Sequence, residues 1–170
     1  MKHPYFKTLI AGCLAGGALI SVFLIILSFV YKDPLNATPK ALDFLLYIGI
    51  SVGTVAYYKV RISGGYLKFI EGLVMVSLVN AAMVLLASIT LWLLIEAKPT
   101  ILQNNTQALL DNYVTNKEEI MKKVQSEEDY QRLLARTEQR TVGIVLFEEA
   151  GLKLMVGFFT SIVAATALRK

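Results

Sequence analysis

The chain has 170 residues, 55% of them hydrophobic, and a formal net charge of +4 at neutral pH. It is too apolar for an ordinary soluble domain and too short for a large transporter. The basic excess does not indicate a nucleic-acid partner, because seven of the 17 Lys and Arg residues lie at predicted membrane-helix ends and no nucleic-acid motif occurs. With a single cysteine, Cys13, and a single histidine, His3, we expect no internal disulfide, metal site or cofactor. We therefore expect an all-α polytopic protein embedded in the lipid bilayer.

The first predicted membrane helix covers residues 8–31, which contain no charged side chain. Its length exceeds the 20 or so residues needed to cross a hydrocarbon core about 30 Å thick. Gly12 and Gly16 are four residues apart and therefore lie on one helix face, where small side chains let another helix backbone approach closely. We predict that this face is a packing seam.

The second predicted membrane helix covers residues 41–58. Asp43 falls in its first turn, where the positive end of the helix dipole favours a carboxylate. Gly49 and Gly53 repeat the four-residue spacing and predict a second packing seam. The connection that follows, residues 59–68, is basic and contains no acidic residue.

The third predicted membrane helix, residues 69–95, is an apolar run of 27 residues around which we expect the chain to be arranged. Glu71 lies near its start and has two interpretations. It could form part of a proton or cation pathway, or it could pair with Lys68 at the end of the helix, which we favour. Asn80 lies nearer the middle, where we expect its amide to bond across to another helix rather than to a ligand.

Residues 96–141 form the longest polar segment, with seven basic and eight acidic residues. Apolar residues recur in it at helical spacing, and neither Gly nor Pro occurs between Pro99 and Gly143. We predict an extracytoplasmic helical hairpin whose second arm runs on into the last membrane helix. Its charged faces are either solvated surface or a docking site. The apolar residues that we expect at a docking surface are Leu109, Tyr113, Leu133 and Leu134.

The fourth predicted membrane helix and the C-terminus occupy residues 142–170. The small residues Gly157, Ser161 and Ala165 follow one another at four-residue intervals and predict another packing seam. Glu149 and Lys153 are placed to pair along the helix near the membrane surface. They are either anchors at the interface or part of a polar path through the membrane.

The distribution of basic residues predicts the orientation of the chain. Both ends and the turn at residues 59–68 carry basic residues without acidic neighbours, whereas the basic residues of segment 96–141 are diluted by acidic ones. Because cytoplasmic loops are enriched in Lys and Arg, we expect both termini in the cytoplasm.

The order of these features resembles the domain-of-unknown-function 4199 family of small bacterial membrane proteins. The resemblance is carried by the run Gly64-Gly65-Tyr66-Leu67-Lys68-Phe69-Ile70-Glu71-Gly72 at the entry to the third helix, together with two short-linked helices before it and a charged segment after it. It implies four helices and an inner-membrane location, and it implies no activity.

Two functions of different classes fit this sequence. The first is a structural or accessory subunit of a larger membrane complex, with a membrane protein or a second copy of the chain as its partner. The second is a small transporter or channel, either a monomer or a homodimer, that uses Glu71. We do not expect an enzyme, because the sequence offers no nucleophile with a base, no metal cluster and no nucleotide-binding loop.

Overall fold

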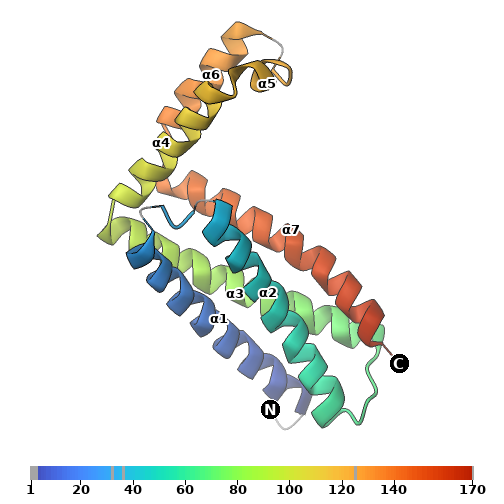
Figure 1. Ribbon diagram of the computed structural model, residues 1–170. Coiled ribbons are helices and arrows are strands. Elements are labelled where there is room, and N and C mark those ends of the chain that lie inside the picture. The colour runs from blue at the N-terminus through green and yellow to red at the C-terminus, as the bar shows by residue number, and fades with distance from the viewer. Residues whose placement is uncertain (1–3, 32, 36, 125, 170) are drawn as a thin grey trace.

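The computed structural model describes residues 4–31, 33–35, 37–124 and 126–169, and every regular element in these ranges is a helix (Figure 1). His3 lies outside the described residues. Four helices are long and apolar enough to cross a membrane: α1 (Pro4–Val30), α2 (Ala37–Tyr57), α3 (Phe69–Ala97) and α7 (Val142–Leu168). The chain is therefore an all-α polytopic membrane protein, as the sequence predicts. The N-terminal end of α1 and the C-terminal end of α7 lie at the same end of this bundle.

The bundle is arranged around α3, which contacts α1, α2 and α7. Its side chains are apolar all round, so it has no polar face to turn towards water. Met75, Val76, Val79 and Met83 are fully buried and form the centre of the core. This is the position that the length of the apolar run predicts.

The small residues of α1 lie against its neighbours. A methyl group on Gly16 would come within 3.0 Å of Met83 and Ile50, and one on Gly17 would overlap Leu86. Gly12 faces Thr54 of α2 in the same way. Protein cores are close-packed, so a single added methyl group at these positions would require the facing side chains to move.

The predicted seam at Gly49 and Gly53 is not a contact between helices of this chain, which corrects the sequence prediction. Both residues are exposed, and a methyl group on either would meet no described atom within 4 Å. The opposite side of α2 turns inwards, with Asp43 and Tyr47 buried. Spacing alone cannot show which side of a helix faces the core, and here the polar side does.

Between α2 and α3 the chain reverses through a π-helical turn, η1 (Tyr58–Ile62), and two glycines. Gly64 and Gly65 have φ angles of 66° and 90°, in the region that favours residues without a Cβ atom. Lys59 and Arg61 belong to η1, so the basic residues gather at the same end of the bundle as the chain termini.

The predicted hairpin is an arm that projects from the other end of the bundle (Figure 1). It consists of α4 (Thr100–Thr115), the short α5 (Lys117–Met121) and α6 (Glu127–Glu138). The Ser126 hydroxyl caps α6 by accepting the backbone N–H of Asp129 at 3.1 Å. The Tyr130 hydroxyl donates to the Tyr113 carbonyl at 3.1 Å and ties the two arms together.

The second arm does not continue into the last membrane helix, so that prediction is wrong. Helix α6 ends at Glu138, and α7 begins at Val142. Thr141 caps α7 because its hydroxyl accepts the backbone N–H of Ile144 at 3.4 Å. The helix thus breaks without Gly or Pro: α6 ends at a cap on Gln139, Thr141 caps the start of α7, and the arm leaves the bundle at an angle (Figure 1).

Candidate functional site

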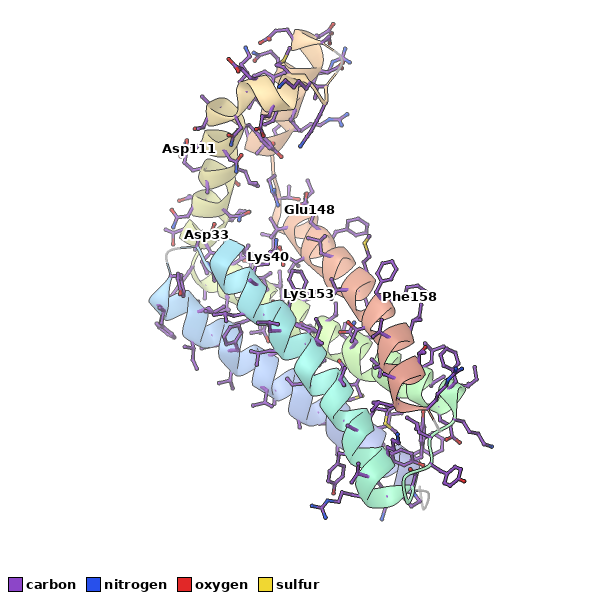
Figure 2. The ribbon with its side chains drawn as sticks, turned by 45° about the vertical axis from the view of Figure 1, so that its right-hand side comes forward. Asp33, Lys40, Asp111, Glu148, Lys153 and Phe158 are labelled. Carbon is purple, nitrogen blue, oxygen red and sulfur yellow. The ribbon has the colours of Figure 1, made fainter. Side chains whose placement is uncertain are left out.

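The candidate site is a set of charged side chains buried between α2 and α7. Asp43 comes from the first turns of α2, and Lys153 comes from the middle of α7. The Lys153 Nζ lies 2.6 Å from Oδ2 of Asp43, and the two side chains are 4% and 5% exposed. Figure 2 shows Lys153 between the two helices, whereas Phe158, also on α7, points away from them.

Two further charges complete the site. Glu149 lies one turn before Lys153 on α7, and its Oε2 is 3.8 Å from the Lys153 Nζ. Its other oxygen, Oε1, lies 2.6 Å from Nζ of Lys40, at the start of the second membrane-spanning segment. We call Lys40, Asp43, Glu149 and Lys153 the ion network. Its two acidic and two basic groups cancel in charge.

The ion network lies within the helices that can span the membrane. At 1.5 Å per residue, Lys153 lies about 16 Å along α7 from Val142, and Asp43 lies about 5 Å from Lys40, where the second span begins. Isolated charges at such depth are costly, and charged residues in membrane helices are generally paired and turned inwards. Lys153 and Glu149 follow this rule, and with Gly157 and Ser161 they form the buried stripe of α7.

The neighbours of Lys153 are polar and tightly packed. The Asn80 amide on α3 donates to the Lys153 carbonyl at 3.3 Å, which is the bond to another helix that we expect for Asn80. A methyl group on Gly157 would overlap that amide, so Gly157 is needed for Asn80 to approach α7. The Lys153 Nζ lies 5.2 Å from the ring centroid of Tyr47, whose hydroxyl donates to the Met83 carbonyl at 3.2 Å.

Asp43 has a free acceptor. Its Oδ1 is buried and has no hydrogen-bond partner among the described residues, although Oδ2 is bound to Lys153. Asp43 as a whole is 4% exposed. An acceptor that is both charged and unpartnered is rare in a protein interior, because its desolvation is not compensated.

The outer end of the ion network meets a hollow at the base of the arm. This hollow has a volume of about 250 Å³, and Lys40 is one of the residues that line it. The Lys40 side chain is 26% exposed, unlike the other three members of the network. Figure 2 shows Lys40 and Asp33 on this side of the molecule. The remaining lining residues are Leu35, Asn105, Ala108, Leu109 and Asn112.

Glu71 does not belong to the ion network. It lies in the first turn of α3, where its Oε2 accepts the backbone N–H of Lys68 at 3.3 Å. The sequence predicts a pair with the Lys68 side chain, whereas the bond that the structure shows is to the Lys68 backbone. Glu71 also borders a separate hollow of about 320 Å³ that Tyr5 and Tyr58 help to line.

The predicted docking residues of the arm are half-buried, because its two helices pack against each other. Tyr113 and Leu133 line a hollow of about 370 Å³ between the arm and the start of α7. Arg140 and Glu148 border the same hollow and form an ion pair at 2.6 Å. Leu109 lines the other hollow, beside Lys40, while Leu134 lines neither of these two.

The sequence predicts that Glu149 and Lys153 pair along α7, and their charged groups lie 3.8 Å apart. It does not predict their partners on the second span, because Lys40 carries no prediction and Asp43 is expected only as a helix-start residue. The missing signal is the inward stripe of α2, on which Asp43, Tyr47 and Ser51 recur every four residues. Among the described residues, no group of three or more His, Cys, Asp or Glu side chains could hold a metal ion.

A protein family described as "protein of unknown function (DUF4199)" matches residues 11–170. The chain belongs to this family. The matched residues of this DUF4199 protein include the whole ion network and the arm. No curated protein and no solved structure matches the chain.

Proposed function

We propose that this DUF4199 protein is a non-enzymatic accessory subunit of a larger complex in the bacterial inner membrane, with both termini in the cytoplasm. The partner in this proposal is another membrane protein or a second copy of the chain. The observation that carries it is the hollow between the arm and α7, which joins apolar Tyr113 and Leu133 to the charged pair Arg140 and Glu148. Such a mixture of apolar anchors and charges is typical of protein interfaces.

The arm itself supports a role in binding. The arm makes few contacts with the bundle, so the membrane helices leave most of its surface uncovered. Isolated helices of 12 and 16 residues are marginal in water, and a pair of them has little core. Val114, an apolar residue of α4, is 64% exposed. A partner seated on the arm would stabilise it.

The outward side of α2 supports a partner within the membrane. Gly49 and Gly53 leave a strip without side chains on the surface of the bundle, four residues apart. Spacing of this kind allows close approach of a further helix. We therefore place the membrane contact of the partner on this strip.

A photo-crosslinking experiment tests the accessory role. A photoreactive residue replaces Ile144, which lines the hollow and is 43% exposed, and a control replaces Gln107, an exposed residue of α4 outside that lining. The proposal predicts one stoichiometric adduct from position 144 in intact membranes, identified by mass spectrometry, and none from position 107. Equal adduct patterns from both positions, or no adduct from position 144, would count against it.

The topology is tested by cysteine labelling in a Cys13→Ser background. Ser63 lies in the basic turn, and Thr115 is exposed at the far end of α4. An impermeant thiol reagent should label a cysteine at position 115 in intact cells, and one at position 63 after permeabilisation alone. The reverse pattern would require the opposite orientation.

A small transporter or channel is the second candidate, favoured by the buried charges between α2 and α7. In that case we expect Asp43 and Lys153, rather than Glu71, to bind the transported ion, because Glu71 accepts a backbone hydrogen bond at the start of α3. Flux through reconstituted vesicles that is lost in Asp43→Asn and kept in Glu71→Gln would favour this function. Absence of flux would leave the accessory role.

A further inference from the structure

The geometry points to a proton-binding site at Asp43 that is loaded from one side of the membrane, through Glu149 and Lys153, from the hollow beside Lys40. This site would operate in either of the two functions proposed above, because it requires access from one side alone. Two features define the site: the order of the charged groups and the unpartnered oxygen of Asp43.

The charged groups form a chain from the surface to the interior. Lys40 lines the hollow and is bound to Glu149 at 2.6 Å, Glu149 lies 3.8 Å from Lys153, and Lys153 is bound to Asp43 at 2.6 Å. The Lys40 side chain is 26% exposed and that of Glu149 9%, whereas those of Lys153 and Asp43 are only 4% and 5% exposed. The chain ends at the Asp43 carboxylate, whose Oδ2 is bound to Lys153 and whose Oδ1 is a buried acceptor without a partner among the described residues. A relay needs this order, with solvent at one end and a free acceptor at the other.

The groups that face Asp43 suit a proton better than a metal ion. From α2 it is faced by Lys40 and Tyr47, and from α7 by Glu149 and Lys153, while α3 contributes the neutral Asn80 near Lys153. Two ammonium groups already balance the two carboxylates. A metal cation would have to displace Lys153, whereas a proton needs one free oxygen and no new ligands.

Proton transfer along the chain balances without a co-reactant. A hydronium ion in the hollow gives a proton to Glu149 and becomes water. Lys153 gives a proton from Nζ to Oδ2 of Asp43, 2.6 Å away, then turns across the 3.8 Å gap towards Glu149 and takes the proton that Glu149 holds. Glu149 ends as a carboxylate and Lys153 as an ammonium, so the net change is one O–H bond formed at Asp43 and one broken in hydronium.

Protonation would also change the packing of the network. Lys153 would no longer face a charge at Asp43, and Glu149 lies within reach at 3.8 Å. The Lys153 ammonium would close this gap, and Lys40, which now shares Glu149, would turn into the hollow. Proton uptake at Asp43 would thus move the Lys40 side chain at the base of the arm.

Carbodiimide labelling tests the site on the full-length protein in lipid nanodiscs. Dicyclohexylcarbodiimide adds to protonated carboxyl groups in apolar surroundings, and peptide mass spectrometry locates the adduct. Between about pH 8 and pH 4, labelling of Asp43 should rise as the pH falls, because the carboxylic acid is the reactive form. Lack of labelling at Asp43 throughout this range, or labelling that does not depend on pH, would overturn the proposal.

A second measurement tests the route. After a rapid drop in pH, proton uptake should be slower by about 100-fold in Glu149→Gln, because a relay group is lost. Glu148→Gln is the matched control, since Glu148 is the neighbouring carboxylate but is bound to Arg140 outside the chain of charges. Uptake as fast in Glu149→Gln as in the control would contradict the route. The labelling of the wild type still decides whether Asp43 binds a proton if Glu149→Gln fails to fold.

Discussion

Lys153 lies between both carboxylates of the ion network, so its replacement by methionine is the most informative change in the bundle. Lys153→Met keeps a long apolar side chain and removes the ammonium group. Asp43 then loses its partner at 2.6 Å, and its Oδ1 already has none. Glu149 retains Lys40 at 2.6 Å. The change therefore leaves one unpaired charge, on Asp43.

The cost of that charge can be bounded in two ways. Removal of one partner from a buried ion pair costs about 3 to 5 kcal/mol. An aspartate of ordinary acidity takes up a proton at pH 7 at a cost of about 4 kcal/mol, which removes the charge instead. We expect Lys153→Met to lower the free energy of unfolding by about 4 kcal/mol at pH 7. The loss should shrink by about 1.4 kcal/mol per pH unit on acidification, as protonation becomes easier.

Replacement of Asp43, alone and together with Lys153→Met, separates the cost of an unpaired charge from the cost of losing the ion pair. Asp43→Leu should cost less than Lys153→Met, because Lys153 can still turn to Glu149 at 3.8 Å. The double variant leaves no unpaired charge and should be within about 1 kcal/mol of the wild type, or more stable than it. Arg132→Met is the control, since its ion pair with Glu128 is exposed and is worth less than about 1 kcal/mol.

Unfolding can be followed in mixed micelles with a rising fraction of dodecyl sulfate. Circular dichroism reports the loss of helix, and the single tryptophan, Trp92, reports on α3 by its fluorescence. The reasoning fails if Lys153→Met is no less stable than Arg132→Met. It also fails if the double variant is as unstable as Lys153→Met.

Three further predictions follow from single contacts. Gly157→Ala should lower the free energy of unfolding by about 1 to 3 kcal/mol in the same assay, through overlap with a neighbouring amide, whereas Gly151→Ala, with open space around it, should not. Glu71→Gln should leave any measured transport or complementation largely intact; complete loss in a folded variant would restore Glu71 as a functional residue. The hydrogen bond from Lys117 lowers the pKa of Glu127. This bond therefore stabilises the arm at pH values above the ordinary glutamate pKa of about 4.3, and the stabilisation is lost as the pH falls through the lowered pKa of Glu127. An NMR titration should show the pKa of Glu127 rising towards its ordinary value in Lys117→Gln, and an unchanged pKa would refute the assignment.

The fold could be predicted from the sequence because the membrane restricts the possibilities. A segment in lipid must satisfy its backbone hydrogen bonds internally, so long apolar runs are helices, and the longest of these helices contacts the other three. This reasoning places α3 at the centre of the bundle and Asn80 against another helix. It fails at residues 139–141, where a threonine cap interrupts a helical pattern that no glycine or proline marks.

The candidate site could be predicted in part. Glu149 and Lys153 are visible as charges within an apolar helix, but their partners lie about 110 residues away in the chain, and spacing along one helix cannot reveal them. Asp43 can also be identified in the sequence, but the helix dipole already accounts for a carboxylate at a helix start. The sequence therefore gives no reason to expect its ion pair with Lys153 of α7. Pairing between helices depends on rotation about the helix axes, which the structure supplies.

The central claim is that Lys153 and Asp43 form an ion pair inside the membrane. It can be measured directly by solid-state NMR in lipid bilayers, on protein with ¹⁵N-labelled lysine side chains and ¹³C-labelled aspartate carboxyl groups. The account predicts strong dipolar dephasing between a lysine Nζ and an aspartate Cγ, consistent with a 2.6 Å contact between Nζ and Oδ2, and its loss in Lys153→Met. Absence of this dephasing in the wild type, or its persistence in Lys153→Met, would contradict the ion pair and the site built on it.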